Sequence, residues 1–101
     1  MKETPNRAAE IEQERQELVR ELIAEDGADW EKDFEPGTYG CHELFDRTHV
    51  VVNLLDISIL NHPACIRDPQ WFELASRALQ LLDELYQSVG SQHLTDDEAA
   101  E

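Results

Sequence analysis

The stretch GTYGCHELFDRTHVVVNLLDISILN, residues 37–61, decides the fold, because its apolar and polar residues separate on a helical wheel. At 100° per residue, one arc is apolar and contains Leu44, Thr48, Val51, Val52, Leu55 and Ile59. The opposite side carries polar groups, namely His42, Asp46, His49, Asn53 and Asp56. Thr38 suits an N-cap, and the His62-Pro63 step disfavours helical geometry. The pattern therefore predicts one long helix over residues 38–61.

A second helix is predicted downstream. Asp68 suits an N-cap, with Pro69 at the favoured first position and Gly90 as a C-cap, so the helix spans about residues 69–89. Its apolar face centres on Trp71, Ala75, Ala78, Leu82, Leu85 and Val89, and Leu74, Leu79, Leu81 and Tyr86 flank it. Two long helices joined by about seven residues predict an antiparallel hairpin over residues 37–94.

The first segment, residues 1–36, is acidic. Its composition predicts a helix over about residues 5–25 that Gly27 ends, followed by a linker. The apolar arc of the central helix is wide, since Val50 and Leu54 extend it, and one neighbouring helix covers only part of it. We expect both the N-terminal helix and a second copy of the chain to supply the missing cover. The predicted fold class is thus all-α, an oligomeric helical hairpin with an N-terminal helix packed on it and a disordered acidic tail at 95–101.

The charge of the chain restricts its partners. Its net charge is −15, with −7 over residues 1–36, −4 over 37–94 and −4 over 95–101. Such a chain repels a phosphate backbone, so direct binding of nucleic acid is not expected. The same charge could suit docking on a basic surface. No segment suits a signal peptide or a membrane span, and we expect a cytoplasmic protein. Cys41 and Cys65 lie near opposite ends of the predicted central helix, too far apart for a disulfide, and suit small buried hydrophobic positions.

The polar side of the central helix is the candidate ligand or partner surface, formed by Tyr39, His42, Glu43, Asp46, Arg47, His49 and Asn53. Within it, His42, Asp46 and His49 follow the spacing i, i+4, i+7 and have side chains that suit zinc or another divalent metal. The string His-Glu-x-x-Asp-x-x-His departs from the zinc-protease pattern at the second histidine. The same face could instead form a polar seam that sets register in an oligomer and responds to pH.

A small anionic ligand is a further alternative, at the start of the central helix. Residues 37–41, GTYGC, offer backbone N–H groups at the positive end of a helix, and two glycines there permit close approach. The same residues also fit ordinary helix capping, and Arg47 nearby is placed to pair with Glu43.

Catalysis has little support in the sequence. Ser58, Ser76, Ser88 and Ser91 lack an elbow motif, and neither cysteine has the setting of a nucleophile. We therefore expect a protein that is not an enzyme and that uses no cofactor.

Over Gly37–Leu94, the strings GTYGCHELFDRTH, NHPACIRDPQWFELASRAL and LYQSVGSQHL resemble a family of short, uncharacterised helical proteins from bacteria and their phages. That family has no assigned function. The layout, a leading segment followed by two helices with an Asp-Pro-x-Trp start to the second, is also similar to small phage helical-hairpin proteins. Those proteins oligomerise and sequester cyclic nucleotide signals of host immunity.

Together these features predict a non-catalytic, oligomeric helical binding module, an effector of phage or bacterial origin that sequesters a small ligand or a protein partner. One alternative is an acidic protein that blocks a basic, nucleic-acid-binding partner by charge mimicry, dependent on the acids of residues 1–36. Another is a metal-binding helical bundle that uses His42, Asp46 and His49.

Overall fold

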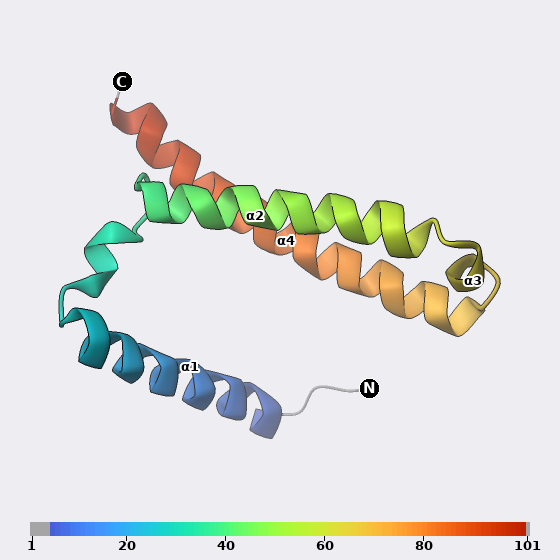
Figure 1. Ribbon diagram of the computed structural model, residues 1–101, viewed down its shortest axis with the longest axis horizontal. Helices are drawn as coiled ribbons and strands as arrows, with labels where there is room; N and C mark the ends of the chain where they lie inside the picture. Colours follow the sequence, from blue (N-terminus) through green and yellow to red (C-terminus); the bar gives the residue numbers. More distant parts are fainter. Residues whose placement is uncertain (1–4, 101) are drawn as a thin grey trace. The chain divides into compact units, whose positions relative to one another are not determined.

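The computed structural model describes residues 5–100, with side chains over residues 6–94, and every regular element in this range is helical. In chain order the elements are α1 (Pro5–Asp26), η1 (Trp30–Asp33), α2 (Tyr39–Leu55), η2 (Asp56–Leu60), α3 (Pro63–Ile66) and α4 (Pro69–Ala100) (Figure 1). The chain forms two compact units, one up to Lys32 and one from Asp33 onward. The predicted all-α class is confirmed, whereas the packing of the N-terminal helix on the hairpin and the oligomeric state stay predictions.

The first unit consists of α1 and the segment after it, up to Lys32. Arg15 donates to both carboxylate oxygens of Glu12 at 2.7 and 2.8 Å. The hydrogen bonds from Arg15, together with one from Gln16, lower the pKa of Glu12 to about 2. Gly27 has a φ of 96° and donates to the carbonyl of Ile23 at 2.9 Å, so it ends α1 as predicted.

The predicted central helix is confirmed in extent, but its last turn is a π-helix. After α2, the N–H of Asn61 bonds to the carbonyl of Asp56 at 3.2 Å, and the Asn61 side chain donates to the same carbonyl at 3.0 Å. A π turn holds more residues than an α turn and so shifts the helical register of its own residues and of those after it. Leu60 is buried at 8% exposure while Ile59 is 48% exposed. Leu60 therefore takes the inward position at this turn, and Ile59, which the helical wheel places in the apolar arc, is turned outward.

Helices α2 and α4 pack as an antiparallel pair, joined through η2 and α3 (Figure 1). Their contact follows alternate steps of four and three residues, the spacing of a coiled-coil seam. On α2 the buried or half-buried seam residues are Cys41, Phe45, Thr48, Val52 and Leu55. On α4 they are Ala75, Leu79, Leu82, Tyr86, Val89 and His93. The predicted hairpin is confirmed, and both free cysteines are buried, as expected of small hydrophobic groups.

In both helices, the residues that face the partner helix are not those at the centre of the apolar arc. Leu44 and Val51 on α2 are exposed, as are Trp71, Ala78 and Leu85 on α4, although the helical wheel places each in the apolar arc of its helix. The reason is the width of the arcs: one neighbouring helix covers a narrow seam, and the remainder of a wide arc stays uncovered. The expectation that the hairpin leaves apolar surface exposed is therefore confirmed.

The predicted end of α4 is wrong, because the helix continues through Gly90 to Ala100. Residues 95–100, expected to be disordered, belong to this helix, while Glu101 lies outside the described residues. A Cβ at position 90 would lie 2.7 Å from Cε1 of Phe45. Gly90 therefore allows α2 to approach α4 closely, and its role is packing rather than termination.

The start of α4 offers a direct test of its cap. The Oδ1 atom of Asp68 accepts hydrogen bonds from the N–H groups of Gln70 and Trp71, at 2.9 and 3.1 Å. We expect Asp68→Ala to lower the free energy of unfolding by about 1 kcal/mol in urea titrations, because these N–H groups lose their acceptor. Asp68→Ser keeps an acceptor and is the control. Equal losses in the two variants would contradict a capping role.

Candidate functional site

The predicted ligand surface is divided between two sides of α2. His42, Asp46, His49 and Asn53 lie on one side of the seam. Glu43 and Arg47 lie on the helix roughly a third of a turn away. There the Arg47 guanidinium pairs with the Glu43 carboxylate at 3.3 Å, with the arginine side chain 77% exposed. Tyr39, at the first residue of α2, is 77% exposed. The seven predicted residues therefore do not converge on one site.

The two histidines of the predicted surface are exposed but contact α4 through their rings. The ring centroid of His42 lies 5.5 Å from that of His93, and the ring of His49 stacks on Tyr86 at 5.4 Å. Phe45 stacks on Tyr86 at 4.8 Å with an angle of 7° between the planes. These five residues, His42, Phe45, His49, Tyr86 and His93, form an aromatic cluster that joins α2 to α4. Offset stacking of this kind contributes about 0.5–1.5 kcal/mol per pair beyond buried area.

His93 is absent from the residues predicted for the site, yet it is the most buried polar residue among the described side chains, with 3% exposure. Its Nδ1 atom accepts a hydrogen bond from the N–H of Gly37 at 2.9 Å. This bond ties α4 to the turn that begins α2. The seam spacing Tyr86, Val89, His93 indicates this position, but a helix that ends at Gly90 excludes it.

The anion site predicted at residues 37–41 has few free donors. The N–H of Gly37 binds His93, that of Thr38 binds the Glu35 carbonyl at 3.0 Å, and that of Cys41 binds the Thr38 hydroxyl at 3.2 Å. The last of these bonds confirms Thr38 as the N-cap. Gly40 lies close to the Phe34 ring and the Asp33 carbonyl, so the glycine accommodates the preceding chain. The N–H groups at the start of α2 are thus used mainly for capping, and the Phe34 ring lies against Gly40.

The three residues of the metal alternative do not form a coordination cluster. Among residues 6–94, no group of three or more His, Cys, Asp or Glu side chains is placed to hold a metal ion. His49 Nε2 lies 3.3 Å from the side-chain nitrogen of Asn53, within hydrogen-bond distance. The two histidines thus contact Asn53 and the rings of His93 and Tyr86.

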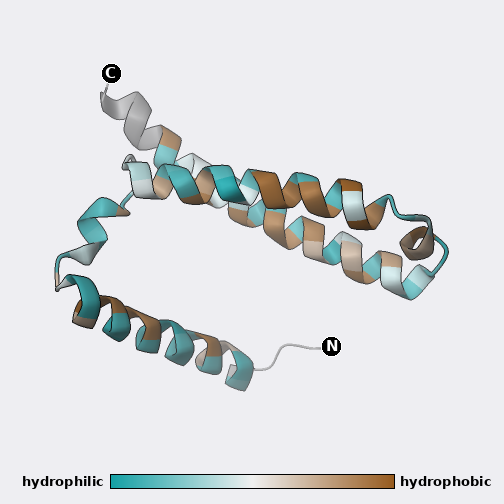
Figure 2. Ribbon diagram, in the orientation of Figure 1, coloured by the Kyte–Doolittle hydropathy of each residue, from teal (hydrophilic) through white to brown (hydrophobic). Residues whose placement is uncertain are grey.

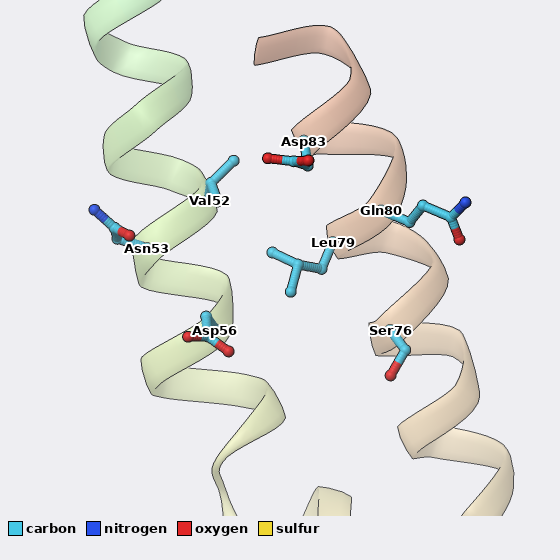
Figure 3. A pocket seen from close by; sticks show the side chains of 7 residues that line it. All are labelled: Val52, Asn53, Asp56, Ser76, Leu79, Gln80 and Asp83. Carbon is cyan, nitrogen blue, oxygen red and sulfur yellow. The ribbon is translucent and has the colours of Figure 1, made fainter. Parts of the chain in front are cut away.

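A polar groove of about 360 Å³ runs between α2 and α4 beside the seam. Figure 3 shows Val52 and Leu79 directed into the space between the helices, with the carboxylates of Asp56 and Asp83 on its two sides. The complete lining is Val52, Asn53, Asp56, Ser76, Leu79, Gln80 and Asp83. The helical wheel places Asn53 and Asp56 together, but the α4 residues that complete the groove depend on how the helices pair. None of the seven lining residues is basic.

The opposite side of the hairpin carries an uncovered apolar face. The groove residues mark one side of the α2–α4 pair. On the side away from the groove, the helical wheel places six large aliphatic side chains. We call these the apolar face: Leu44, Val51 and Leu54 on α2, and Leu74, Leu81 and Leu85 on α4. Their exposed fractions are 49, 44, 59, 57, 65 and 45%, respectively. Figure 2 shows hydrophobic segments along both helices, dense in the second half of α2. The hairpin therefore has one polar side and one apolar side.

Comparisons with known proteins assign no relative: no family model, curated protein or solved structure matches this chain. Within the described part of the chain, no helix is both long and apolar enough to cross a bilayer. The class that the structure defines is that of an all-α protein built on an antiparallel helical hairpin.

Proposed function

We propose that this chain is a non-catalytic helical binding module whose hairpin docks a partner on the apolar face. The observation that carries the proposal is the set of six aliphatic side chains, each between 44 and 65% exposed on one side of two packed helices. Soluble monomers rarely leave contiguous apolar patches larger than a few hundred Å², and larger ones mark interaction sites. Sequestration of a partner in a phage or bacterial setting, which the resemblance implies, is compatible with this surface.

The test asks whether the apolar face is a surface or part of a core. In a surface that awaits a partner, Leu54→Gln and Leu81→Gln each change the unfolding free energy of the monomer by no more than about 0.5 kcal/mol. The dye anilinonaphthalene sulfonate, which fluoresces on exposed apolar surface, should respond less to the double variant than to the parent chain. Losses of about 2 kcal/mol or more per site, measured where light scattering shows a monomer, would mean that the chain covers this face itself. The proposal would then be wrong.

A second candidate function is charge mimicry, which the polar groove favours. Asp56 and Asp83 line the groove from its two sides, the groove has no lining base, and the chain has a net charge of −15. Such a surface suits a basic partner, with affinity that weakens as salt rises. Fluorescence anisotropy with an arginine-rich peptide tests it. Binding that is lost in Asp56→Asn/Asp83→Asn would support this function, and binding unchanged by that variant would remove it.

A further inference from the structure

We propose that the occupant of the apolar face is a second copy of this chain, and that two hairpins pair about a two-fold axis to form a four-helix bundle. The proposal rests on the proposed function, because it names the partner for the same surface. Three features of the hairpin carry it: the area of the face, the spacing of its residues and the charges around it.

The area of the apolar face suits a stable homodimer. From their exposed fractions, the six side chains offer roughly 600 Å² per chain, and Trp71, which is 53% exposed, enlarges the apolar surface of α4. A specific interface of standard size buries about 800 Å² on each partner. Interfaces between identical chains are also more apolar than other interfaces. The exposed aliphatic area therefore accounts for most of what one such interface requires.

The spacing of the face indicates that its occupant is helical. Leu44 and Val51 lie seven residues apart on α2, and so do Leu74 and Leu81 on α4. Ala78 and Leu85 are also seven residues apart, and on α4 they lie between the Leu74–Leu81 stripe and the seam. Each helix thus carries a second stripe with the seven-residue period of the seam already used between α2 and α4. A helix needs two such stripes in a four-helix bundle, where it packs against two neighbours.

The charges around the face suit a chain with the same net charge. Arg47 precedes Leu54 by seven residues on the same stripe and pairs with Glu43 at 3.3 Å. On the outer edge of α4, Arg77 pairs with Glu73 at 3.4 Å. These pairs neutralise Glu43 and Glu73, and Glu84, on the same edge of α4, has no ion pair among the described side chains. On the other side, Asp56 and Asp83 both lie at the groove. Two copies, each of net charge −15, therefore meet here with fewer unpaired carboxylates than the groove side would bring together.

The same charges argue against other occupants. A basic partner would find two unpaired carboxylates at the polar groove, whereas the charges beside the apolar face are mostly paired. An anionic bilayer attracts basic segments and repels a chain with this excess of acids. A two-fold contact uses one patch twice, so a single apolar face on each chain is enough to close the assembly.

Sedimentation velocity of the full chain from about 1 to 200 µM tests the proposal, since this range covers micromolar dissociation constants. We expect a species of twice the chain mass that grows with concentration. Leu54→Glu/Leu81→Glu should raise the dimer Kd about tenfold or more, because it places carboxylates in an apolar contact. The matched control is Asn53→Glu/Gln80→Glu, which adds the same two charges at the adjacent residues on the groove side and should leave the Kd within about threefold. The uncharged variant Leu54→Gln/Leu81→Gln should also weaken the dimer. Circular dichroism of its monomer shows whether the hairpin still folds, so that a folding defect is not mistaken for lost dimerisation.

Several outcomes would overturn the proposal. A monomer at every concentration excludes the second copy, and so does a dimer that persists in Leu54→Glu/Leu81→Glu. The failure of this proposal differs from the failure of the proposed function. A chain that stays monomeric but tolerates the glutamine substitutions keeps an open docking face for a different partner. A monomer destabilised by those substitutions has no such face.

Discussion

Gly90→Ala is expected to lower the free energy of unfolding by about 1–3 kcal/mol, although alanine is the better helix former. The added Cβ would lie 2.7 Å from Cε1 of Phe45, which is closer than two carbon atoms approach in folded proteins. The Phe45 ring cannot easily turn aside, since it stacks on Tyr86 at 4.8 Å. Urea unfolding followed by circular dichroism, at one fixed protein concentration, measures the effect.

In the control for Gly90→Ala, the effect of the substitution on stability should change sign. In a Phe45→Ala background the ring is absent, and the methyl group added at position 90 enters space that the ring had filled. The intrinsic preference for alanine should then dominate, and the same substitution should raise the unfolding free energy by about 1 kcal/mol. A loss of stability in both backgrounds would show that position 90 requires glycine for its backbone. The close contact between α2 and α4 would then not be the cause.

The helix starts could be predicted because they depend on local chemistry. Thr38 accepts from the N–H of Cys41 in the structure, and Asp68 accepts from two N–H groups at the start of α4. Gly27 ends α1 with positive φ. A cap involves residues two to four positions apart, so the sequence contains all that is needed to recognise it. The same holds for the break before Pro63, which disfavours helical geometry at the preceding residue.

Gly90 and the end of α2 could not be predicted in this way, because their conformations depend on the opposite helix. A glycine after an amphipathic segment indicates a C-cap when the segment is considered alone. Here Gly90 faces Phe45, a residue 45 positions away in the sequence, and α4 continues. The π turn at Asp56–Leu60 likewise turns Leu60, rather than Ile59, toward the interior. Periodicity at 100° per residue does not anticipate such a shift in register.

The candidate site could be predicted only in part, for the same reason. The polar side of α2 follows from the helical wheel, which groups His42, Asp46, His49 and Asn53. The groove that the structure shows also requires Ser76, Gln80 and Asp83 from α4. Which α4 residues face those of α2 depends on how far the two helices slide and rotate against each other. Phe45, Tyr86 and Gly90 determine that pairing through long-range packing, which is not encoded in either helix alone.

His93→Ala is expected to lower the free energy of unfolding by about 2–4 kcal/mol. The imidazole is 3% exposed, and its ring lies 5.5 Å from His42 and 6.1 Å from Phe45, so truncation leaves a cavity within the aromatic cluster. The substitution also removes the acceptor for the N–H of Gly37. Because Gly37 is exposed, water can replace part of the lost acceptor, and the bond itself contributes about 0.5–1.5 kcal/mol. Urea unfolding gives the total effect, and amide hydrogen exchange at Gly37 isolates the lost bond.

Two matched variants separate the hydrogen bond of His93 from its packing. His93→Phe keeps a ring in the aromatic cluster but has no acceptor, so it should lose only part of the stability that His93→Ala loses and should still accelerate exchange at Gly37. His42→Ala removes the same side chain from an exposed position of the same cluster, and it should cost no more than about 1 kcal/mol. If His42→Ala costs as much as His93→Ala, both imidazoles stabilise the hairpin through ring contacts. The bond from Gly37 would then contribute little, and the turn before α2 would be held by Thr38 and the chain around Phe34 instead.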